Sequence, residues 1–236
     1  MAQWLDTVFS AMDLGVFTLM HNMAVAAGES AGPEITSFLT YLMHFISFFA
    51  HDGLCMFALG VILMIPRRTR KLGVCVFLAV CCGGIITNLT LKPLVARMRP
   101  YANMEHLAAT VKDWWIAVGQ PLESDRSFPS GHTTSATAAM VGLFLASRRK
   151  KYIWPVLIFP FMMATSRVYL MVHYTSDVLA GLISGFLGGL AAFFITRWLF
   201  GFLERHRNVR LFAFALDFEP IAFLKGLKRS KAKDEN

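Results

Sequence analysis

The stretch LGVCVFLAVCCGGIITNLTL, residues 72–91, contains twenty consecutive residues without a charged side chain. A helix of this length spans about 30 Å, which is the hydrocarbon thickness of a lipid bilayer. The whole chain has the same character, because 56% of its 236 residues are hydrophobic and only 16% are charged. Soluble domains average about 45–50% apolar and about 25% charged residues. The stretch predicts a transmembrane helix, and the composition predicts an integral-membrane protein.

Other apolar runs predict further spans. Residues 178–196 form a second uninterrupted run, in which four glycines would let another helix approach closely: Gly181, Gly185, Gly188 and Gly189. Residues 133–147 and 152–166 are shorter runs that become long enough to span when their flanks are included. The run 35–66 is interrupted by His44, His51 and Asp52, and we expect one span near residues 46–66.

The first 34 residues allow two interpretations. They contain Asp6, Asp13, His21 and Glu29, followed by a break at Gly32-Pro33. An amphipathic helix lying in the membrane interface would accommodate these polar residues. A sixth span is the alternative. The predicted fold is therefore an all-α, integral-membrane bundle of five or six transmembrane helices.

Basic residues indicate how the bundle is oriented. One cluster occupies residues 67–71, a second occupies 148–151, and the C-terminal tail adds five Lys or Arg residues between 225 and 233. No Lys or Arg precedes Arg67. The positive-inside rule predicts that both clusters and the tail lie in the cytoplasm. In this setting the net charge of +8 favours a membrane surface or an anionic substrate over nucleic acid.

Three polar stretches then fall together on the opposite side of the membrane. They are KPLVARMRP (residues 92–100), PSGH (129–132) and SRVYLMVHYTSD (166–177). Each joins the end of an apolar run to a polar loop. Together they supply a lysine, arginines, two histidines, a carboxylate and a Ser-Gly turn at the start of a helix, which suits phosphoryl transfer.

The cations and the turn are suited to hold a phosphate group. Lys92, Arg99 and Arg167 would neutralise the phosphate oxygens, and the planar arginines could bind them bidentately. Ser130 is a favourable N-cap for the helix that follows. The backbone N–H groups of Ser130, Gly131 and His132 would add to the anion site, and Gly131 would let the backbone approach the phosphate.

The histidines and the aspartate predict a covalent mechanism. His173 and Asp177 are four residues apart, so a helical turn would place them on one face. Asp177 would accept a hydrogen bond from one ring nitrogen of His173 and leave the other nitrogen free to attack phosphorus. His132 would protonate the departing oxygen and later activate water. The loop shows no carboxylates spaced to hold Mg²⁺, and we expect no metal or other cofactor.

The combined spacing resembles a known family. Lysine, six residues and Arg-Pro, then Pro-Ser-Gly-His, then Ser-Arg, five residues, His, three residues and Asp is similar to the signature of the type 2 phosphatidic acid phosphatase (PAP2) family. The wider superfamily includes the vanadium haloperoxidases. The matching positions are Lys92, Arg99, Pro100, Pro129, Ser130, Gly131, His132, Ser166, Arg167, His173 and Asp177.

The resemblance implies a helical bundle with its site near the outer surface. It implies that His173 is the nucleophile, Asp177 its partner and His132 the acid. It also implies that phosphate binds to Lys92, Arg99, Ser130, Gly131, His132 and Arg167. We therefore expect an N-terminal interfacial or membrane-spanning helix (1–34), a PAP2-like transmembrane catalytic domain (35–204) and a basic cytoplasmic tail (205–236).

Single residues of this set also have structural explanations. Lys92 and Arg99 could be interfacial anchors, and Asp177 could complement a helix dipole. Their occurrence together in order favours a site. His44, His51 and Asp52 could line the path by which substrate reaches the site, or they could mark a helix end at the interface.

The leading hypothesis is a membrane lipid phosphatase of the bacterial plasma membrane, acting on the extracytoplasmic side through a phosphohistidine. Undecaprenyl diphosphate, phosphatidate, phosphatidylglycerol phosphate and diacylglycerol diphosphate are the candidate substrates, and recycling of the undecaprenyl carrier for cell-wall synthesis fits an outward site. The alternatives are a lipid phosphotransferase on the same scaffold, a vanadium-dependent haloperoxidase and a non-enzymatic anion- or lipid-binding membrane protein.

Overall fold

The described part of the chain is built from helices, without strands. The computed structural model describes residues 1–30, 32 and 34–219. The α-helices are α1 (Ala2–Val8), α2 (Ser10–Ala26), α3 (Phe38–Phe48), α4 (Leu54–Met64), α5 (Arg70–Gly84), α6 (Lys92–Val95), α7 (Met104–Ala117), α8 (Gly131–Ala146), α9 (Lys150–Ile153), α10 (Ile158–Tyr169), α11 (Thr175–Arg205) and α12 (Arg210–Asp217). A π-helical segment, Ile85–Leu91, joins α5 to α6. The prediction of an all-α fold is confirmed for these residues.

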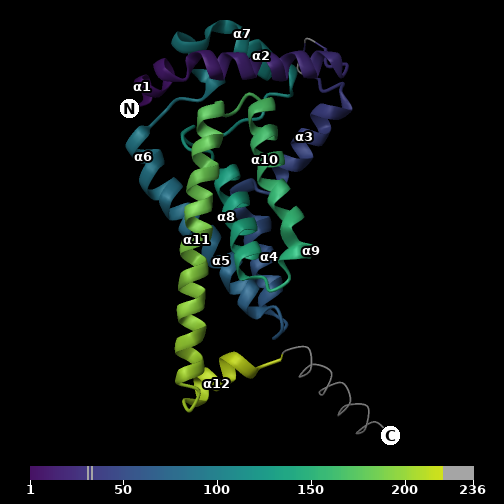
Figure 1. Cartoon of the computed structure of the whole chain (residues 1–236). Coiled ribbons are helices and arrows are strands. Elements are labelled where there is room, and N and C mark those ends of the chain that lie inside the picture. Colours follow the sequence, from purple (N-terminus) through teal and green to yellow (C-terminus); the bar gives the residue numbers. More distant parts are fainter. Residues whose placement is uncertain (31, 33, 220–236) are drawn as a thin grey trace, which may run out of the picture.

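The helix α8 lies at the centre of the bundle, among α4, α5, α10 and α11 (Figure 1). Its residues from His132 to Gly142 are all buried. Small Ala, Ser and Thr side chains make up most of this segment, so neighbouring helices can pack on every side of it. The glycines of α11 bring that helix especially close, because a Cβ atom added at Gly185 would lie 2.5 Å from Cβ of Thr137.

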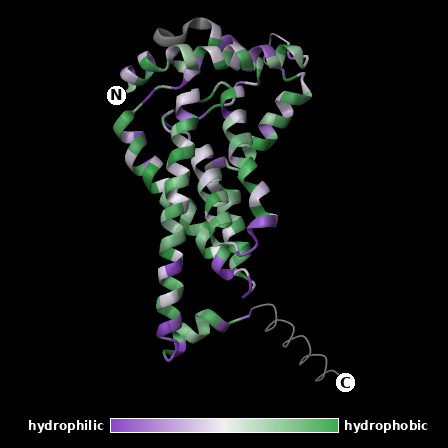
Figure 2. Ribbon diagram, viewed as in Figure 1, coloured by the Kyte–Doolittle hydropathy of each residue, from purple (hydrophilic) through white to green (hydrophobic). Residues whose placement is uncertain are grey.

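Two helices are long and apolar enough to cross a membrane. They are the segment Arg70–Ala102, which includes α5, the π-helical segment and α6, and Thr175–Arg205, which is α11. Figure 2 shows hydrophobic residues along the length of the bundle. Large apolar side chains of α11 point outward, with Ile183 and Trp198 each 63% exposed. Such an exposed apolar surface fits contact with lipid rather than water.

The prediction of one span near residues 46–66 is wrong, because this region does not form a single helix. Two shorter apolar helices, α3 and α4, occupy this region, and a turn of 3-10 helix at His51–Gly53 separates them. Gly53 adopts a left-handed conformation with φ of 71°, which glycine tolerates better than other residues. The break between α3 and α4 thus falls at the polar residues His51 and Asp52, which interrupt the apolar run.

The N-terminal helices cover one end of the bundle. The axes of α1 and α2 differ by 68°, and taken together the two helices have the length and apolarity of a third candidate span. Figure 1 shows α1 and α2 lying across the end of the bundle rather than alongside α11. Buried residues of α2, among them Asp13 and Phe17, face the bundle end.

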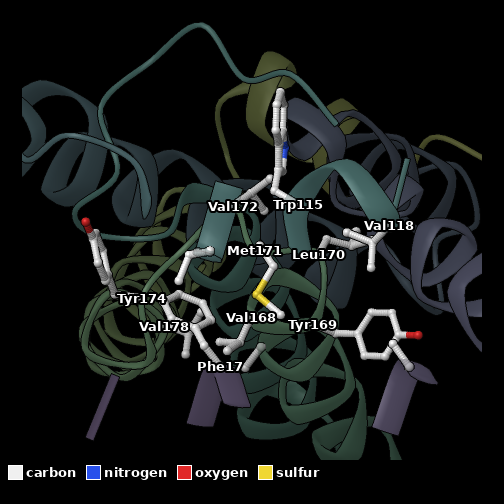
Figure 3. Packing of buried hydrophobic residues seen from close by; sticks show 13 residues of the cluster. Phe17, Trp115, Val118, Val168, Tyr169, Leu170, Met171, Val172, Tyr174 and Val178 are labelled. Carbon is white, nitrogen blue, oxygen red and sulfur yellow. The ribbon is translucent and has the colours of Figure 1, made fainter. Parts of the chain in front are cut away.

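A hydrophobic cluster fixes the loop between α10 and α11. Leu170, Met171 and Val172 are almost fully buried in it, together with Phe17 of α2 and Trp115 of α7. Figure 3 shows these side chains gathered around Met171. This packing holds rigidly the short loop that also carries His173.

Candidate active site

The three polar stretches meet at the bundle end that α1 and α2 cover. The backbone N–H of Ser130 donates a hydrogen bond to the carbonyl of Asp177 at 3.1 Å. A guanidinium nitrogen of Arg99 donates to the carbonyl of Val172 at 2.8 Å. A Cβ atom added at Gly131 would lie 3.2 Å from the ammonium of Lys92. Residues from three separate parts of the sequence thus form one site.

His173 lies in the loop before α11 and is 1% exposed. Its Nε2 atom is 3.1 Å from a guanidinium nitrogen of Arg99. Because a guanidinium only donates hydrogen bonds, Nε2 must be the acceptor and the ring proton must be on Nδ1. The Nδ1 atom lies 3.5 Å from Oδ2 of Asp177. The contacts therefore select the tautomer in which Nε2 carries a lone pair.

The electrostatic surroundings keep this imidazole neutral. Burial, followed by the positive charges of Arg99, Arg167 and Lys92, lowers the pKa of His173 well below its usual range. A neutral imidazole is the form that can act as a nucleophile. The cation cluster thus has two effects, since it attracts anions and keeps the adjacent histidine unprotonated.

Asp177 approaches His173 in a different way from the one the spacing predicts. A shared helical turn is the wrong geometry, because α11 begins at Thr175 and His173 precedes it. The carboxylate of Asp177, in the first turn of α11, instead reaches back over the helix start. Its Oδ2 atom accepts hydrogen bonds from the backbone N–H of Tyr174 at 3.1 Å and from the hydroxyl of Ser127 at 2.5 Å.

The PSGH segment begins the central helix. Ser130 is the N-cap of α8, and its hydroxyl oxygen accepts a hydrogen bond from the N–H of Thr133 at 3.4 Å. The N–H of Ser130 is already bonded to Asp177 and is not available to an anion, contrary to expectation. Gly131 and His132 lie in the first turn, where N–H groups have no intrahelical acceptor. The ring centroids of His132 and His51 are 5.6 Å apart.

Three cations surround His173, and all are buried. Lys92 is 8% exposed, Arg99 5% and Arg167 2%. The Nε atom of Arg167 and the Nδ1 atom of His173 are buried without a hydrogen-bond partner of good geometry in the described part of the chain. A buried donor without a partner is costly, so Arg167 retains an N–H group suited to a further acceptor.

Two carboxylates that the sequence analysis did not single out also enter the site. Asp125 pairs with Lys92 and Arg99, and Glu123 pairs with Arg167. Burial disfavours ionisation of Asp125, but the hydrogen bonds and charges of Lys92 and Arg99 together outweigh it, so the pKa of Asp125 is below its usual range. Both residues belong to the loop that leads into PSGH, and an anion bound to the three cations would compete with them.

A further missed residue is Arg97, which lies within KPLVARMRP. It is fully buried, and its guanidinium bonds to Oδ1 of Asp177 at 2.7 Å. Its other carboxylate partners, Asp6 and Asp13, come from α1 and α2. The sequence offered one signal for this contact with the N-terminal helices, namely the charged residues Asp6 and Asp13 within an otherwise apolar segment.

A cavity of about 790 Å³ connects the site to apolar helix surfaces. Its polar part is lined by Lys92, Arg99, His132 and His173. Its apolar part includes side chains of α4, α5 and the π-helical segment, namely Phe57, Val80, Cys81, Ile85 and Leu89. His51 lines the cavity, which fits the interpretation that it lies on the path of the substrate. His44 is instead hydrogen-bonded to the carbonyl of Val118 at 2.8 Å. The volume lies within the range of about 300–1,000 Å³ typical of ligand pockets.

The residues that the structure describes contain no group of three or more His, Cys, Asp or Glu side chains placed to hold a metal ion. The charged residues that line the cavity are Lys92, Arg99, Glu123 and Asp125, and both carboxylates are paired with cations. Whether the protein acts without a metal stays a prediction for experiment.

Comparison with known proteins identifies relatives of this chain. Residues 68–202 match the family model described as the PAP2 superfamily. A decaprenylphosphoryl-5-phosphoribose phosphatase of Mycobacterium tuberculosis is 36% identical over 136 residues, which are 56% of this chain and 66% of that protein. The match therefore spans slightly less than two thirds of this relative's length. An undecaprenyl-diphosphatase of Bacillus subtilis, BcrC, is 29% identical over 66% of this chain and 75% of its own.

The fold also matches a solved structure. The PAP2 type phosphatidylglycerolphosphate phosphatase from Bacillus subtilis, a transmembrane protein, superposes with a TM-score of 0.52 and 22% sequence identity. The superposition covers 86% of this chain and 94% of that one. Together with the apolar helices, this similarity indicates an integral-membrane protein. Because the family match covers more than half of the chain, the resemblance inferred from the three motifs is confirmed: the protein belongs to the PAP2 superfamily.

Proposed function

We propose that the protein hydrolyses a lipid phosphate or diphosphate through a phosphohistidine at His173. One observation carries the proposal. The Nε2 atom of a buried, neutral imidazole lies within a cluster of cations, and its other nitrogen faces a carboxylate. This combination provides a nucleophile and an anion site at the same place.

The substrate phosphate would bind between Lys92, Arg99 and Arg167. These cations would replace their bonds to Glu123 and Asp125 with bonds to phosphate oxygens. The partnerless Nε of Arg167 would supply an additional donor. Neutralising the oxygens is essential, because their negative charge otherwise repels the nucleophile.

In the first step, Nε2 of His173 forms a bond to phosphorus as the bond from phosphorus to the leaving oxygen breaks. His132 donates a proton to that oxygen, so that the lipid leaves as an alcohol, or as a monophosphate when the substrate is a diphosphate. In the second step, His132 takes a proton from water, whose oxygen attacks phosphorus and breaks the P–N bond. Asp177 stabilises the positive charge that develops on the His173 ring.

The shape of the cavity favours a lipid over a free sugar phosphate. It extends from the cations to side chains such as Phe57 and Ile85 on helices that face the membrane. Among the relatives, those from Mycobacterium tuberculosis and Bacillus subtilis are named for decaprenyl, undecaprenyl or phosphatidylglycerol phosphates. A polyprenyl phosphate or diphosphate is therefore our first choice of substrate, with phosphatidylglycerol phosphate and phosphatidate next.

We also propose an arrangement in the membrane with five spans. The broken pair α3–α4, then α5, α8, α10 and α11 would cross the bilayer, and α1–α2 would lie in the interface over the site. In Figure 1, the loop between α8 and α9 and the start of α12 lie at the bundle end opposite α1 and α2. The basic residues 148–151 occupy that end, which the positive-inside rule assigns to the cytoplasm. The active site would then face the extracytoplasmic side of a bacterial plasma membrane.

The domain boundaries stay part of this proposal. An interfacial segment 1–34 and a catalytic domain 35–204 fit the arrangement of α1–α2 and the bundle. The proposed cytoplasmic tail, 205–236, extends beyond the described residues after 219.

Phosphate release from a panel of lipid phosphates tests the function. The full-length protein in detergent would be assayed against an undecaprenyl diphosphate, a phosphatidylglycerol phosphate and a phosphatidate, with and without EDTA. We expect release from at least one lipid, undiminished by EDTA, and a loss of at least about 10³-fold in His173→Ala. The control His206→Ala changes an exposed histidine at the far end of α11 and should be fully active.

Full activity of His173→Ala would exclude this histidine as the nucleophile. Loss of activity in EDTA that zinc or magnesium restores would contradict a metal-free mechanism. Transfer of the phosphoryl group to an added lipid alcohol in preference to water would favour the phosphotransferase.

A further inference from the structure

The buried side chain of Arg97 connects the N-terminal helices to the proposed catalytic pair. It lies just after α6 and is 0% exposed. Its guanidinium bonds to Asp6 at 2.7 Å, Asp13 at 3.2 Å and Asp177 at 2.7 Å. It also lies over the ring of Tyr174, 3.6 Å from the centroid. One arginine thus joins α1, α2 and the first turn of α11.

The contact with Asp177 bears directly on His173. Oδ1 of Asp177 accepts from Arg97, while Oδ2 accepts from Ser127 and from the Tyr174 backbone. With both oxygens held in this way, the carboxylate has one orientation, and in it Oδ2 lies 3.5 Å from Nδ1 of His173. Without Arg97, Asp177 would be a buried carboxylate lacking its charge partner, and its orientation would be less restricted.

The N-terminal helices in turn hold Arg97. Asp13 is 0% exposed and also accepts from the backbone N–H of Ser176 at 3.1 Å, in the first turn of α11. Asp6 accepts from the amide of Asn103 at 3.1 Å as well as from Arg97. Both aspartates lie outside residues 68–202, which match the superfamily. A buried network of this kind adds little net stability, because desolvation of the charges offsets their attraction.

We propose that Arg97 is a positioning residue for the His173–Asp177 pair, and that Asp6 and Asp13 make the N-terminal helices part of the catalytic unit. This inference rests on the proposed function. Arg97 acts through Asp177 and does not line the cavity. Its loss should therefore slow attack on phosphorus and leave binding of the phosphate group unchanged.

Kinetics of full-length variants test the inference with the best lipid substrate of the panel. Arg97→Met should lower kcat about 10²-fold, the order expected when a reacting group is misplaced by about 1 Å. Arg97→Lys keeps the charge but not the planar fork, so it should recover part of that loss. KM, and the inhibition constant of inorganic phosphate, should stay within about twofold of wild type.

Asp13→Asn tests the N-terminal part of the network, and should lower kcat about tenfold with the same unchanged phosphate inhibition. The matched control is Arg197→Met, which removes an exposed guanidinium about 30 Å farther along α11. It should behave as wild type. If Arg97→Met does not accumulate as folded protein, Arg97→Lys and Asp13→Asn carry the test.

Wild-type kcat in Arg97→Lys and Asp13→Asn would overturn the inference. A parallel weakening of phosphate inhibition would also overturn it, because it would indicate a general loss of structure at the site. These outcomes differ from failure of the proposed function, which would appear as full activity of His173→Ala whatever the Arg97 variants do.

Discussion

Neutralising Glu123 and Asp125 should make the protein bind inorganic phosphate more tightly. Both carboxylates are bonded to the cations proposed to hold the substrate: Glu123 to Arg167, and Asp125 to Lys92 and Arg99. A phosphate ion must displace these carboxylates before it can contact the same cations. The variants Glu123→Gln and Asp125→Asn retain the shape of each side chain and remove its charge.

Exposure of the two side chains sets the size of the effect. Glu123 is 15% exposed, and a charge-assisted hydrogen bond in such a setting contributes about 1.5–3 kcal/mol. Asp125 is 48% exposed, so its ion pairs contribute only about 0.2–1 kcal/mol. At about 1.4 kcal/mol per factor of ten, Glu123→Gln should tighten phosphate binding by about tenfold or more. Asp125→Asn should tighten it by no more than about fivefold.

The assay is competitive inhibition of lipid-phosphate hydrolysis by inorganic phosphate. The inhibition constant should fall in the order wild type, Asp125→Asn, Glu123→Gln, double variant. Asp113→Asn is the control, because it removes an exposed carboxylate of α7 that does not line the cavity. An unchanged or higher inhibition constant in Glu123→Gln would refute the reasoning, and would mean that this carboxylate orients Arg167 instead of competing with the anion.

Three other outcomes follow from the packing and the charges of the site. Gly185→Ala should destabilise the fold by about 1–3 kcal/mol, because the new Cβ atom would lie 2.5 Å from Cβ of Thr137. Gly201→Ala is the control: its new Cβ atom would have no neighbouring atom within 4 Å, so the higher helix propensity of alanine should raise the thermal midpoint. Burial lowers the pKa of His173, so below about pH 6.5 the unfolded chain binds a proton at this residue that the folded protein does not bind. Acidification from pH 7 should therefore lower the free energy of unfolding by up to about 1.4 kcal/mol per pH unit. Replacing His173 with Gln should reduce that slope in thermal unfolding measured across pH, and an unchanged slope would assign it to other groups. Arg167→Lys should lower kcat/KM about 10- to 100-fold in steady-state assays, since lysine cannot form the bidentate contact, and a wild-type value would exclude that contact.

The sequence was sufficient to predict which stretches meet at the site. Each motif adjoins the end of an apolar run, and alternation of the runs across a membrane brings those ends to one side. Lys92, His132 and His173 therefore could be grouped without knowing any helix packing. Glycine spacing likewise predicted the close approach of α11, which the contacts of Gly185 confirm.

Contacts that depend on tertiary packing could not be predicted. Arg97 and Asp13 are 84 residues apart in sequence, and their pairing depends on how α2 lies over the bundle end. The same holds for Glu123, whose loop has no regular periodicity. The prediction that His173 and Asp177 share a helical turn was wrong, because a four-residue spacing fits both a helical turn and a loop that precedes a helix start.

Phosphorylation of His173 is the central claim, and trapping the phosphorylated enzyme tests it most directly. The enzyme would be mixed with ³²P-labelled lipid phosphate, quenched in alkali because phosphohistidine is labile in acid, and mapped by peptide mass spectrometry. We expect label on His173, at a higher level in His132→Gln, which should slow attack by water on the P–N bond. Turnover without label on any histidine in either protein, or label that persists in His173→Ala, would contradict the account.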